Sequence, residues 1–437
     1  MKSSQPKSSL IGEHVAMPAS LWAATAIPAL ALTPLLHSVS ADVAIIGAGF
    51  TGLSAAIALA ELGLSSVVID AGQPGWGASG RNNGQVIAGL KQDPNVVESV
   101  WPGEKGERLV RFGSEAPGKV FDLIQRHGID CAAVKEGWIQ PAYTRKGEAA
   151  VHRRAQAWRE RGIDTQIIEG STLHKTLGTQ KYHVGWLDPR GGALQPLSFV
   201  RGLAQVAVTL GVKIFDRTFA IGIQRTTAGF EVRTNAGSVM AKHIIVATGA
   251  YAETLVPGLR RSFVPVRTAQ VATRKLPEAM RSAILPMGNV ASDTRALLTS
   301  FRLSPDGRLV MGGAGATAGL SHAGIVPYLH KAGTELFQHL GKLEWEFAWS
   351  GYFAVTNDHL PHVHEPMPDL HVAAGCNGRG IAVSTAMGIE LARRINGVSK
   401  GDLSVPVSEI RGVAFHEFRA LGVAAATRYK RLQDRFG

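Results

Sequence analysis

The chain has 437 residues, 45% of them apolar and 18% charged, which excludes a disordered or fibrous protein and leaves room for two domains. Its formal charge of +12 raises nucleic acid as a partner, but the basic residues are scattered. We therefore expect no nucleic-acid binding and favour an anionic substrate or cofactor. The two cysteines, Cys131 and Cys376, give neither a disulfide framework nor metal-ligand spacing. They predict a reducing, cytoplasmic compartment and no metal site.

Residues 1–40 are interpreted as an N-terminal arm. The apolar stretch 21–36 is similar to the core of a signal peptide, but Glu13 precedes it and Pro28 and Pro34 interrupt it. It is also too short to span a bilayer, so no integral membrane span is expected. We expect the arm to pack over the core, and removal of the arm with export is the alternative.

The stretch from 42 to 70 predicts a strand, a glycine turn, a helix and a second strand. Residues 42–47 form a short apolar run of the kind found in buried parallel strands. Apolar residues then recur at helical spacing over 53–64, and residues 67–69 form another buried strand. This order indicates a βαβ nucleotide-binding unit.

The glycines of this unit have separate physical roles. Gly47 permits the tight turn, Gly49 lets the backbone approach a pyrophosphate, and Gly52 lets the helix pack closely on the strand. The helix N-terminus offers free N–H groups and a partial positive charge to the phosphates. Asp70, eighteen residues beyond Gly52, is placed to accept hydrogen bonds from a ribose 2′-hydroxyl. The alternative is that the glycines serve only as turn residues.

A second glycine-rich loop covers residues 75–85. It combines its glycines with small polar side chains and one guanidinium, at Ser79, Arg81, Asn82 and Gln85. Glycines permit backbone contact with a planar or phosphorylated ligand, and an arginine neutralises phosphate charge. We therefore predict contact with a cofactor rather than a flexible linker.

Helices and strands alternate over the middle of the chain. Helices are predicted over 109–124, over 148–161 and from 197 onward, and strands over 137–141, 212–215, 230–233 and 238–240. The turn at 235–237 joins the last two strands. These segments indicate a second βαβ-like return.

Further strands follow toward the C-terminus. They are predicted over 243–249, 263–273, 301–311, 349–358 and 370–374. The third of them folds into a hairpin at 305–307, where Pro, Asp and Gly form a turn signal. Because the strands at 263–273 and 301–311 come after a completed nucleotide unit, we assign these two to a second, antiparallel domain. A helix after residue 380 closes the core.

Together these motifs resemble the D-amino-acid-oxidase-like superfamily of FAD-dependent oxidoreductases, and most of all its gamma-glutamylputrescine oxidase branch. The resemblance rests on residues 41–54, 77–82, 244–251, 306–313, 356–361 and 375–388. It implies an α/β fold with a Rossmann-like FAD-binding domain and a second, mostly antiparallel substrate domain. The FAD-binding domain would comprise 41–95, 150–255 and 365–437, and the substrate domain 96–149 and 256–364.

The resemblance also implies a set of FAD-binding residues. They are Gly47, Gly49, Phe50, Thr51, Gly52, Asp70, Ala71, Ser79, Arg81, Asn82, Gln85, Val212, Lys213, Ile214, Ala247, Thr248, Gly249, Gly378, Arg379, Gly380 and Ile381. The strand at 212–214 would meet the adenine, and the start of the last helix would face the flavin and stabilise negative charge on it. Gly351 falls where some relatives carry a cysteine that tethers the flavin, so FAD should be non-covalent.

The resemblance gives further expectations about the substrate. Phe353 falls where glycine-oxidase relatives carry a carboxylate-binding arginine, which favours an amine with a remote or conjugated carboxylate over a free amino acid. Trp349 and Phe353 are expected to line the substrate cavity, with plain core packing as the alternative. Tyr352 and His359 are the candidates for a catalytic base. The histidine also fits a polar turn.

The expected reaction is FAD-dependent oxidation of an amine to an imine and then an aldehyde, with release of hydrogen peroxide. The partners would be a small-molecule amine and molecular oxygen. An alternative is a dehydrogenase that passes electrons to a quinone or carrier at a membrane, which the basic charge and the apolar N-terminal arm would suit. Residues 276–330 also lack the lysine that sarcosine-oxidase relatives use with oxygen, which argues against efficient use of oxygen. A non-catalytic flavin-binding protein is the alternative of another class.

Overall fold

The computed structural model describes residues 15–316 and 322–436. Within these residues, one eight-stranded sheet contains the βαβ unit, and its main path has the order β17-β18-β11-β1-β2-β8, with β10 and β9 attached beside β11. The bounds are β1 Ser38–Ile46, β2 Ser66–Ile69, β8 Lys213–Phe215, β9 Ala220–Thr226, β10 Gly229–Thr234, β11 Ser238–Val246, β17 His362–Met367 and β18 Leu370–Ala374. The strands from β18 to β8 run parallel.

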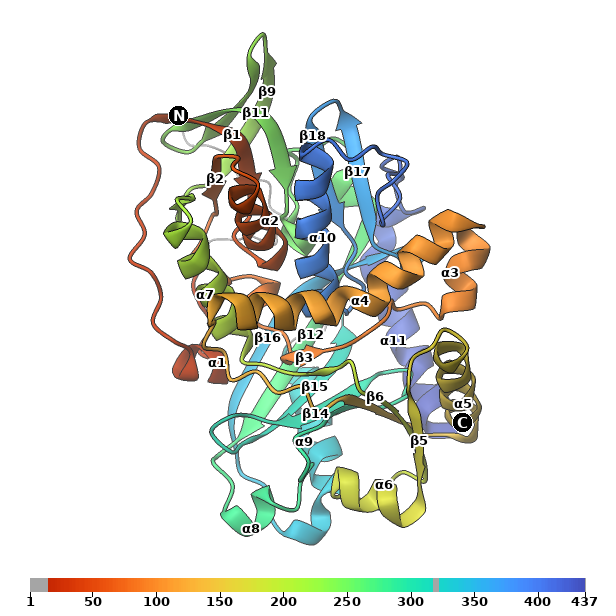
Figure 1. Cartoon of the computed structure of the whole chain (residues 1–437). Coiled ribbons are helices and arrows are strands. Elements are labelled where there is room, and N and C mark those ends of the chain that lie inside the picture. The colour runs from red at the N-terminus through yellow and green to blue at the C-terminus, as the bar shows by residue number, and fades with distance from the viewer. Residues whose placement is uncertain (1–14, 317–321, 437) are drawn as a thin grey trace.

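The centre of this sheet is buried on both faces. All four residues of β2 and the last four of β1 are buried, as expected for parallel strands covered by helices. The helices α2 (Phe50–Glu61) and α10 (Gly380–Ile395) lie side by side against the sheet, and α4 (Glu104–His127) crosses them (Figure 1). The predicted nucleotide-type unit is therefore present, and its strand begins four residues before the expected start because residues 38–41 pair with β11.

The second sheet is mostly antiparallel and has the order β16-β12-β15-β14-β13-β4-β6-β5 within the described residues. The bounds are β4 Trp138–Pro141, β5 Gln166–Glu169, β6 Val184–Asp188, β12 Phe263–Thr273, β13 Val290–Ser292, β14 Thr299–Leu303, β15 Leu309–Ala316 and β16 Trp345–Thr356. A short pair, β3 (Gln85–Val86) and β7 (Gly192–Ala193), lies apart from both sheets. The predicted α/β class with a second antiparallel sheet is confirmed.

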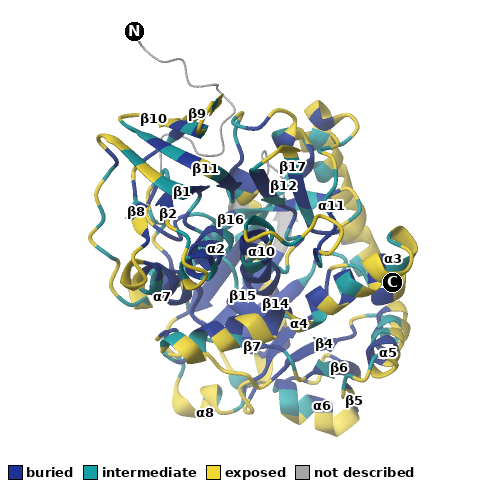
Figure 2. Ribbon diagram, turned by 45° about the horizontal axis from the view of Figure 1, so that its top comes forward, coloured by how far each residue is buried: buried dark blue, intermediate teal, exposed yellow. Residues whose placement is uncertain are grey.

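The remaining helices surround the two sheets. They are α1 Leu21–Thr25, α3 Pro94–Val100, α5 Arg145–Arg159, α6 Gly170–Leu177, α7 Pro196–Thr209, α8 Glu278–Arg281, α9 His322–Leu336 and α11 Arg419–Phe436. Their outer faces are exposed, while the strands β4, β6, β13 and β14 in the middle of the second sheet are mostly buried (Figure 2). The core of the molecule thus lies along the two sheets and the helices between them.

Two segments lie differently from the expected domain bounds. The strands β5 and β6 were expected in the first domain, but β6 pairs with β4 and so belongs to the second sheet. Helix α4 was expected in the substrate domain, but it packs on α10 of the first domain. Both placements depend on contacts between segments far apart in the sequence, which local patterns do not contain.

The arm is part of the folded structure over its described residues. Ser20 caps α1 by accepting a hydrogen bond from the Ala23 N–H, and Trp22 is completely buried. The Trp22 ring packs edge-to-face on Trp349 with centroids 5.7 Å apart. In the described part of the chain, no helix has the length and apolarity that a bilayer crossing requires.

Candidate active site

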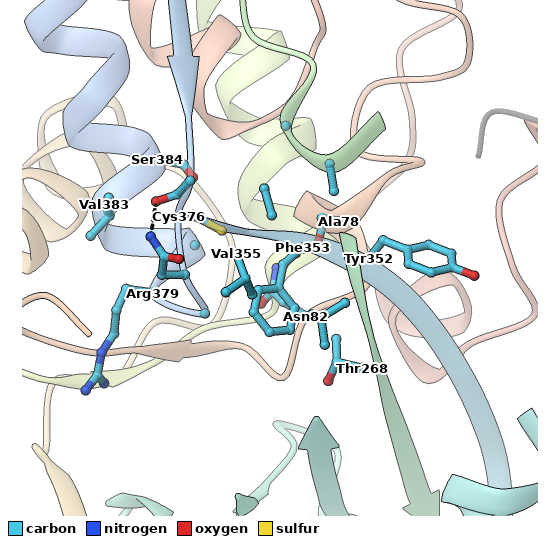
Figure 3. Close-up of a pocket in the computed structure, with 18 of the residues that line it drawn as sticks. Ala78, Asn82, Thr268, Tyr352, Phe353, Val355, Cys376, Arg379, Val383 and Ser384 are labelled. Carbon is cyan, nitrogen blue, oxygen red and sulfur yellow. Dashed lines mark hydrogen bonds between the residues drawn. The ribbon is translucent and has the colours of Figure 1, made fainter. Parts of the chain in front are cut away.

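A cavity of about 670 Å³ lies between the two sheets. Its walls come from the start of α2, the glycine-rich loop at 75–85, the end of β11, the strand β16 and the start of α10. Figure 3 shows its middle, where Phe353 and Val355 of β16 lie near Asn82 and the loop before α10. The cavity therefore joins the nucleotide-type unit to the second sheet.

The glycine turn at the start of α2 is tightly packed. Gly47 has a φ of +114°, and a Cβ there would lie 2.6 Å from the carbonyl oxygen of Ala247. A Cβ on Gly52 would lie 1.9 Å from the carbonyl oxygen of Gly47. A larger residue at either position would displace backbone, so the turn can keep this shape only with glycine.

Two helix N-termini line the cavity without side-chain caps. The N-cap residues are Gly49 for α2 and Arg379 for α10, and neither can cap its helix, since glycine has no side chain and arginine has no side-chain acceptor. The N–H of Phe50 donates to Ser79 Oγ at 3.1 Å, while the next N–H groups of the first turn have no partner within their own helix. Both ends carry partial positive charge and can accept anionic ligand groups.

Asp70 joins the glycine turn to the end of β2. Its Oδ2 accepts from the N–H of Ala48 at 2.6 Å, and its Oδ1 accepts from the N–H of Gly72 at 2.9 Å and from Trp76 Nε1 at 2.6 Å. Burial raises the pKa of Asp70 to about 6 despite these donors. A carboxylate oxygen has two acceptor positions, so Oδ2 can still accept a ligand hydroxyl.

The loop at 75–85 is held by its own hydrogen bonds. Arg81 donates to the carbonyls of Trp76 and Ser350, and burial lowers the pKa of Arg81. The Asn82 side chain accepts from the N–H of Gly84 and donates to carbonyls on its own loop. Gln85 connects the loop to the second sheet, since its Nε2 donates to the Ala291 carbonyl at 2.9 Å. This wall of the cavity is therefore rigid.

Some polar atoms in the cavity wall have no partner among the described residues. They are Nδ2 and Oδ1 of Asn83 and Oε1 of Gln270, all of them buried. Buried polar atoms are nearly always hydrogen-bonded in native proteins. These atoms lie just behind the cavity surface, as do the partnerless Trp186 Nε1 and Arg379 Nε of two further lining residues.

A family model described as FAD dependent oxidoreductase matches residues 42–394 of the chain. This match covers far more than half of the sequence. The chain belongs to the family of FAD-dependent oxidoreductases. The resemblance predicted from the motifs and the identity of the cofactor are thereby confirmed.

Relatives of this oxidoreductase match it over most of its length. It is 30% identical over 370 residues to probable oxidoreductase OrdL of Haemophilus influenzae, covering 83% of this chain and 85% of the relative. It is 28% identical over 426 residues to gamma-glutamylputrescine oxidoreductase of Escherichia coli, covering 96% and 98%. The crystal structure of glycine oxidase from Geobacillus kaustophilus superposes with a TM-score of 0.69 at 22% identity, covering 82% and 95%. At that identity the superposition shows the shared fold.

The cavity fits FAD by the chemistry of its walls. The start of α2 suits the pyrophosphate because its N-cap residue is a glycine with no side chain to compete for the free N–H groups. Asp70 keeps an acceptor position for a ribose hydroxyl. Most of the predicted FAD-binding residues line it. These are Gly47, Gly49, Phe50, Thr51, Asp70, Ala71, Ser79, Arg81, Asn82, Gln85, Ala247, Thr248, Gly249, Gly378, Arg379, Gly380 and Ile381.

Four predicted FAD-binding residues lie elsewhere. Gly52 is buried under the glycine turn, where it sets the distance between α2 and the turn. Val212, Lys213 and Ile214 lie at or beside the edge strand β8, which pairs with β2. The cavity wall beyond that strand is formed by 218–220 instead, because the N–H of Thr218 donates to the Asp70 carbonyl and folds the chain back over this end.

Of the two predicted substrate residues, one lines the cavity and the other lies in the hydrophobic core. Phe353 lines the cavity, and its ring lies beside Gly378 at the start of α10 (Figure 3). Trp349 is 2% exposed and is absent from the wall. Its Nε1 donates to the Arg81 carbonyl at 3.0 Å, so it supports the loop at 75–85 from behind.

The two predicted catalytic residues lie at different parts of the cavity. The side chain of Tyr352 lies on the opposite face of β16 from that of Phe353 (Figure 3). The Tyr352 hydroxyl accepts a hydrogen bond from Arg267 Nε at 3.0 Å. His359 lines the cavity with a φ of +58°. Burial, with the cations Lys91 and Lys430 nearby, lowers the pKa of His359, so its imidazole is neutral at pH 7.

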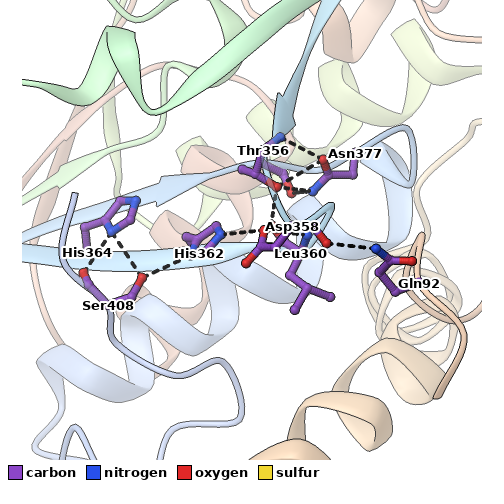
Figure 4. A network of polar contacts seen from close by, with 9 residues as sticks. Gln92, Thr356, Asp358, Leu360, His362, His364, Asn377 and Ser408 are labelled. Carbon is purple, nitrogen blue, oxygen red and sulfur yellow. Dashed lines mark hydrogen bonds and ion pairs between the residues drawn. The ribbon is translucent and has the colours of Figure 1, made fainter. Parts of the chain in front are cut away.

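The histidines that follow form a structural network (Figure 4). His362 Nε2 lies 3.0 Å from Asp358 Oδ1, and its Nδ1 lies 3.0 Å from Ser408 Oγ. His364 Nδ1 lies 2.8 Å from the Ser408 carbonyl, and burial lowers the pKa of His364 to about 4. In the described ranges, no group of three or more His, Cys, Asp or Glu residues could hold a metal ion.

Sequence reasoning missed an aromatic and basic part of the cavity. Its residues come from α5, α11, the second sheet and the segment before α3, and none belongs to the glycine motifs. They are Lys91, Trp138, Arg154, Trp158, Trp186 and Lys430. The sequence signal for these residues was the overall surplus of basic charge, which did not show where in the chain a binding site would lie.

Proposed function

We propose that this enzyme oxidises the carbon–nitrogen bond of an amine, as a gamma-glutamylputrescine oxidase does, and releases hydrogen peroxide. The proposal depends on one observation: a continuous cavity joins two uncapped helix N-termini to an arm lined by tryptophans and basic side chains. The similarity to gamma-glutamylputrescine oxidoreductase over 96% of this chain supports the same class of reaction.

The reaction removes two electrons and two protons from an amine and leaves an imine. Water then adds to the imine carbon and ammonia departs, which gives an aldehyde. Bound FAD supplies the two-electron acceptor for the carbon–hydrogen bond that breaks. Molecular oxygen is the terminal acceptor in this proposal, and it takes up the two electrons and two protons as hydrogen peroxide.

The protein favours the uncharged amine, which is the reactive form. Phe353 and Val355 present apolar surface to the cavity. Desolvation by such surface lowers the pKa of an ammonium group. The neutral imidazole of His359 is the proposed proton acceptor within this cavity, and Tyr352, held by Arg267, is the proposed second candidate.

The test is an anaerobic screen of the FAD-loaded enzyme with polyamines, their glutamyl conjugates and N-methyl amino acids. We expect at least one glutamyl polyamine to bleach the visible flavin absorbance, with formation of one aldehyde per flavin. Failure of every amine to bleach the flavin would contradict the proposal and favour a non-catalytic flavin-binding protein.

A second candidate function is a dehydrogenase that passes electrons to a quinone or carrier. The sequence feature that favours it is the lack of any lysine over residues 276–330. Oxygen uptake and hydrogen peroxide in equal amounts during turnover would support the oxidase. Rapid reduction of a soluble quinone with negligible oxygen uptake would support the dehydrogenase.

FAD is proposed to bind without a covalent bond. Gly351 lies beside the aliphatic part of Arg81, where a Cβ would be 3.1 Å from the Arg81 Cβ, and it offers no nucleophile to the flavin. Acid precipitation should therefore release all the FAD into the supernatant. Flavin that remains in the protein pellet would contradict this.

A further inference from the structure

One branch of the cavity, called the cavity arm to distinguish it from the N-terminal arm of residues 1–40, carries a surplus of positive charge. Lys91, Arg154, Arg379 and Lys430 line it, and they come from four separate segments of the chain. The carboxylate that lines the same arm, Asp93, is already paired with Arg154 at 2.8 Å. The arm therefore holds more cationic than anionic groups within the described residues.

The Arg379 guanidinium has no hydrogen-bond or ion-pair partner among the described residues. Its side chain points away from Phe353 and Asn82 (Figure 3) and lies over the ring of Trp138, 5.0 Å from the ring centroid. Its Nε is buried without a hydrogen-bond partner among the described residues. Burial and the nearby Arg154 lower the pKa of Arg379 to about 10, so the guanidinium is charged at pH 7 but not paired.

Other buried or half-buried arginines have hydrogen-bond partners, including Arg108 and Arg201, whose Nε atoms are likewise buried without one. Arg302 is 2% exposed and donates to the carbonyls of Gly84 and Leu194, each at 2.7 Å. Arg154 pairs with Asp93 and donates to Gln140 Oε1. Arg379 is half-buried, and none of its side-chain nitrogens has a hydrogen-bond partner among the described residues, which distinguishes it from these arginines.

Lys91 is the second unpaired cation of the arm. Its side chain is accessible where it lines the cavity, and it forms no ion pair with the described carboxylates. Lys91 is exposed as a residue, but the cavity walls desolvate its ammonium group, and this desolvation together with the cations Arg379, Arg154 and Lys430 lowers the pKa of Lys91 to about 8. Like charges that line one cavity repel one another, and an anion bound between them would remove this repulsion.

The walls next to these cations are aromatic. Trp138, Trp158 and Trp186 line the same cavity, and the rings of Trp138 and Trp186 pack edge-to-face with centroids 5.5 Å apart. Such walls suit an apolar chain of methylene groups. The FAD phosphates have their own place at the start of α2, so the cations of this arm remain available.

We propose that Arg379 and Lys91 bind a carboxylate carried by the substrate at the end remote from its reacting amine. This assignment rests on the proposed amine oxidation and specifies its substrate class: an amine with an apolar spacer and a terminal carboxylate. The spacer lies along the tryptophans, the carboxylate accepts charge-assisted hydrogen bonds from both cations, and the amine faces the flavin. The backbone before α10 stays free to contact FAD, because only the Arg379 side chain turns into the arm.

The test measures binding, so it does not depend on turnover. Isothermal titration calorimetry of the FAD-loaded enzyme is performed with glutarate and with its neutral diamide. We expect glutarate to bind and the diamide to bind at least tenfold more weakly. Arg379→Met and Lys91→Met should each raise the glutarate Kd at least tenfold, and Arg379→Lys should recover part of the loss. Lys342→Met is the matched control, because Lys342 is exposed and lies outside the cavity.

FAD content and the thermal midpoint of each variant show whether it is folded. Since Lys91 is accessible, Lys91→Met keeps the proposal testable even where an Arg379 variant misfolds. Three results would overturn it: no glutarate binding to the wild-type enzyme, equal binding of the diamide, or an unchanged glutarate Kd in folded Lys91→Met. If glutarate binds as expected but no amine bleaches the flavin, the carboxylate-binding site stands and only the proposed amine oxidation is refuted.

Discussion

Asp70 illustrates how one side chain serves both folding and ligand binding. Its carboxylate accepts three hydrogen bonds that fix the glycine turn against β2. Asp70→Asn would turn an amide N–H toward one of these donors, which costs about 1–3 kcal/mol. We expect the FAD dissociation constant to rise roughly five- to 150-fold. Flavin fluorescence during titration of the apoprotein measures this, and an unchanged FAD affinity would refute the role of Asp70.

Lys91 gives a pH dependence with a definite sign. In the free enzyme its pKa is about 8, and the groups around it are Arg379, Arg154, Lys430, Asp93 and His359. A bound carboxylate raises this pKa, so affinity is full below pH 8 and falls as Lys91 loses its proton above it. Glutarate Kd should therefore increase by up to tenfold per pH unit above pH 8. A flat profile in the wild type, or the same slope in Lys91→Met, would count against the assignment.

At single positions, the predictable features were those with local causes. Gly52 is needed because its Cβ would meet the Gly47 carbonyl, and Gly47 is needed for its positive φ, so their spacing alone indicated the turn; the second constraint on Gly47, its approach to the Ala247 carbonyl, is not local. Arg379 is unpaired because none of the distant segments around it places a carboxylate within hydrogen-bonding distance. No pattern around residue 379 contains that information, and the residue was therefore expected to contact FAD like its neighbours.

The element that most directly positions the cofactor is α2. A Cβ at residue 52 would lie 1.9 Å from the Gly47 carbonyl oxygen, so Gly52→Ala must displace the helix from the turn. We expect purified Gly52→Ala to carry little FAD and to lose more than about 1–3 kcal/mol of stability, the usual cost of overpacking. Absorbance spectra and thermal unfolding measure both effects.

The matched control for that substitution is Gly118→Ala in α4. Gly118 is helical, and a methyl group added there would meet no atom within 4 Å beyond its own turn of helix. This change should leave FAD content unaltered and stabilise the protein by about 0.5–1 kcal/mol, because alanine loses less backbone entropy on folding. Equal FAD content in Gly52→Ala and Gly118→Ala would contradict the packing role of Gly52.

Strands and helices were predictable where their residues alternate or repeat locally. The strand at 263–273 and the strand at 370–374 were expected with the bounds that β12 and β18 have. Which sheet a strand joins was harder to predict, since β6 joins the second sheet by pairing with β4, and β5 by pairing with β6. That pairing joins segments almost fifty residues apart, and the sequence near each strand is compatible with either sheet.

The N-terminal arm connects both halves of the molecule. Trp22 Nε1 donates to the Asn82 carbonyl in the cavity wall at 2.8 Å, and Gln195 Nε2 donates to the Trp22 carbonyl at 2.9 Å. The same ring packs against Trp349 of the second sheet. The arm thus stabilises the cavity wall by contacts to both domains.

We expect Trp22→Ala to destabilise the protein by about 3–5 kcal/mol and to reduce FAD content. Trp22→Phe keeps much of the apolar contact but removes the hydrogen bond to Asn82, and it should cost about 0.5–1.5 kcal/mol from the lost bond. Leu36→Ala, at a 68% exposed position of the same arm, is the control and should change stability by less than about 0.5 kcal/mol. Unfolding by denaturant measures the stability of all three variants. Equal stability of Trp22→Ala and Leu36→Ala would show that the arm is not part of the core.

The central claim is that one cavity brings the amine of a carboxylate-bearing substrate to bound FAD. Anaerobic mixing of the FAD-loaded enzyme with a glutamyl diamine and with the parent diamine tests it most directly. We predict that the glutamyl compound bleaches the flavin absorbance at least tenfold faster at equal, subsaturating concentration. Bleaching by neither compound, or at equal rates by both, would contradict the account.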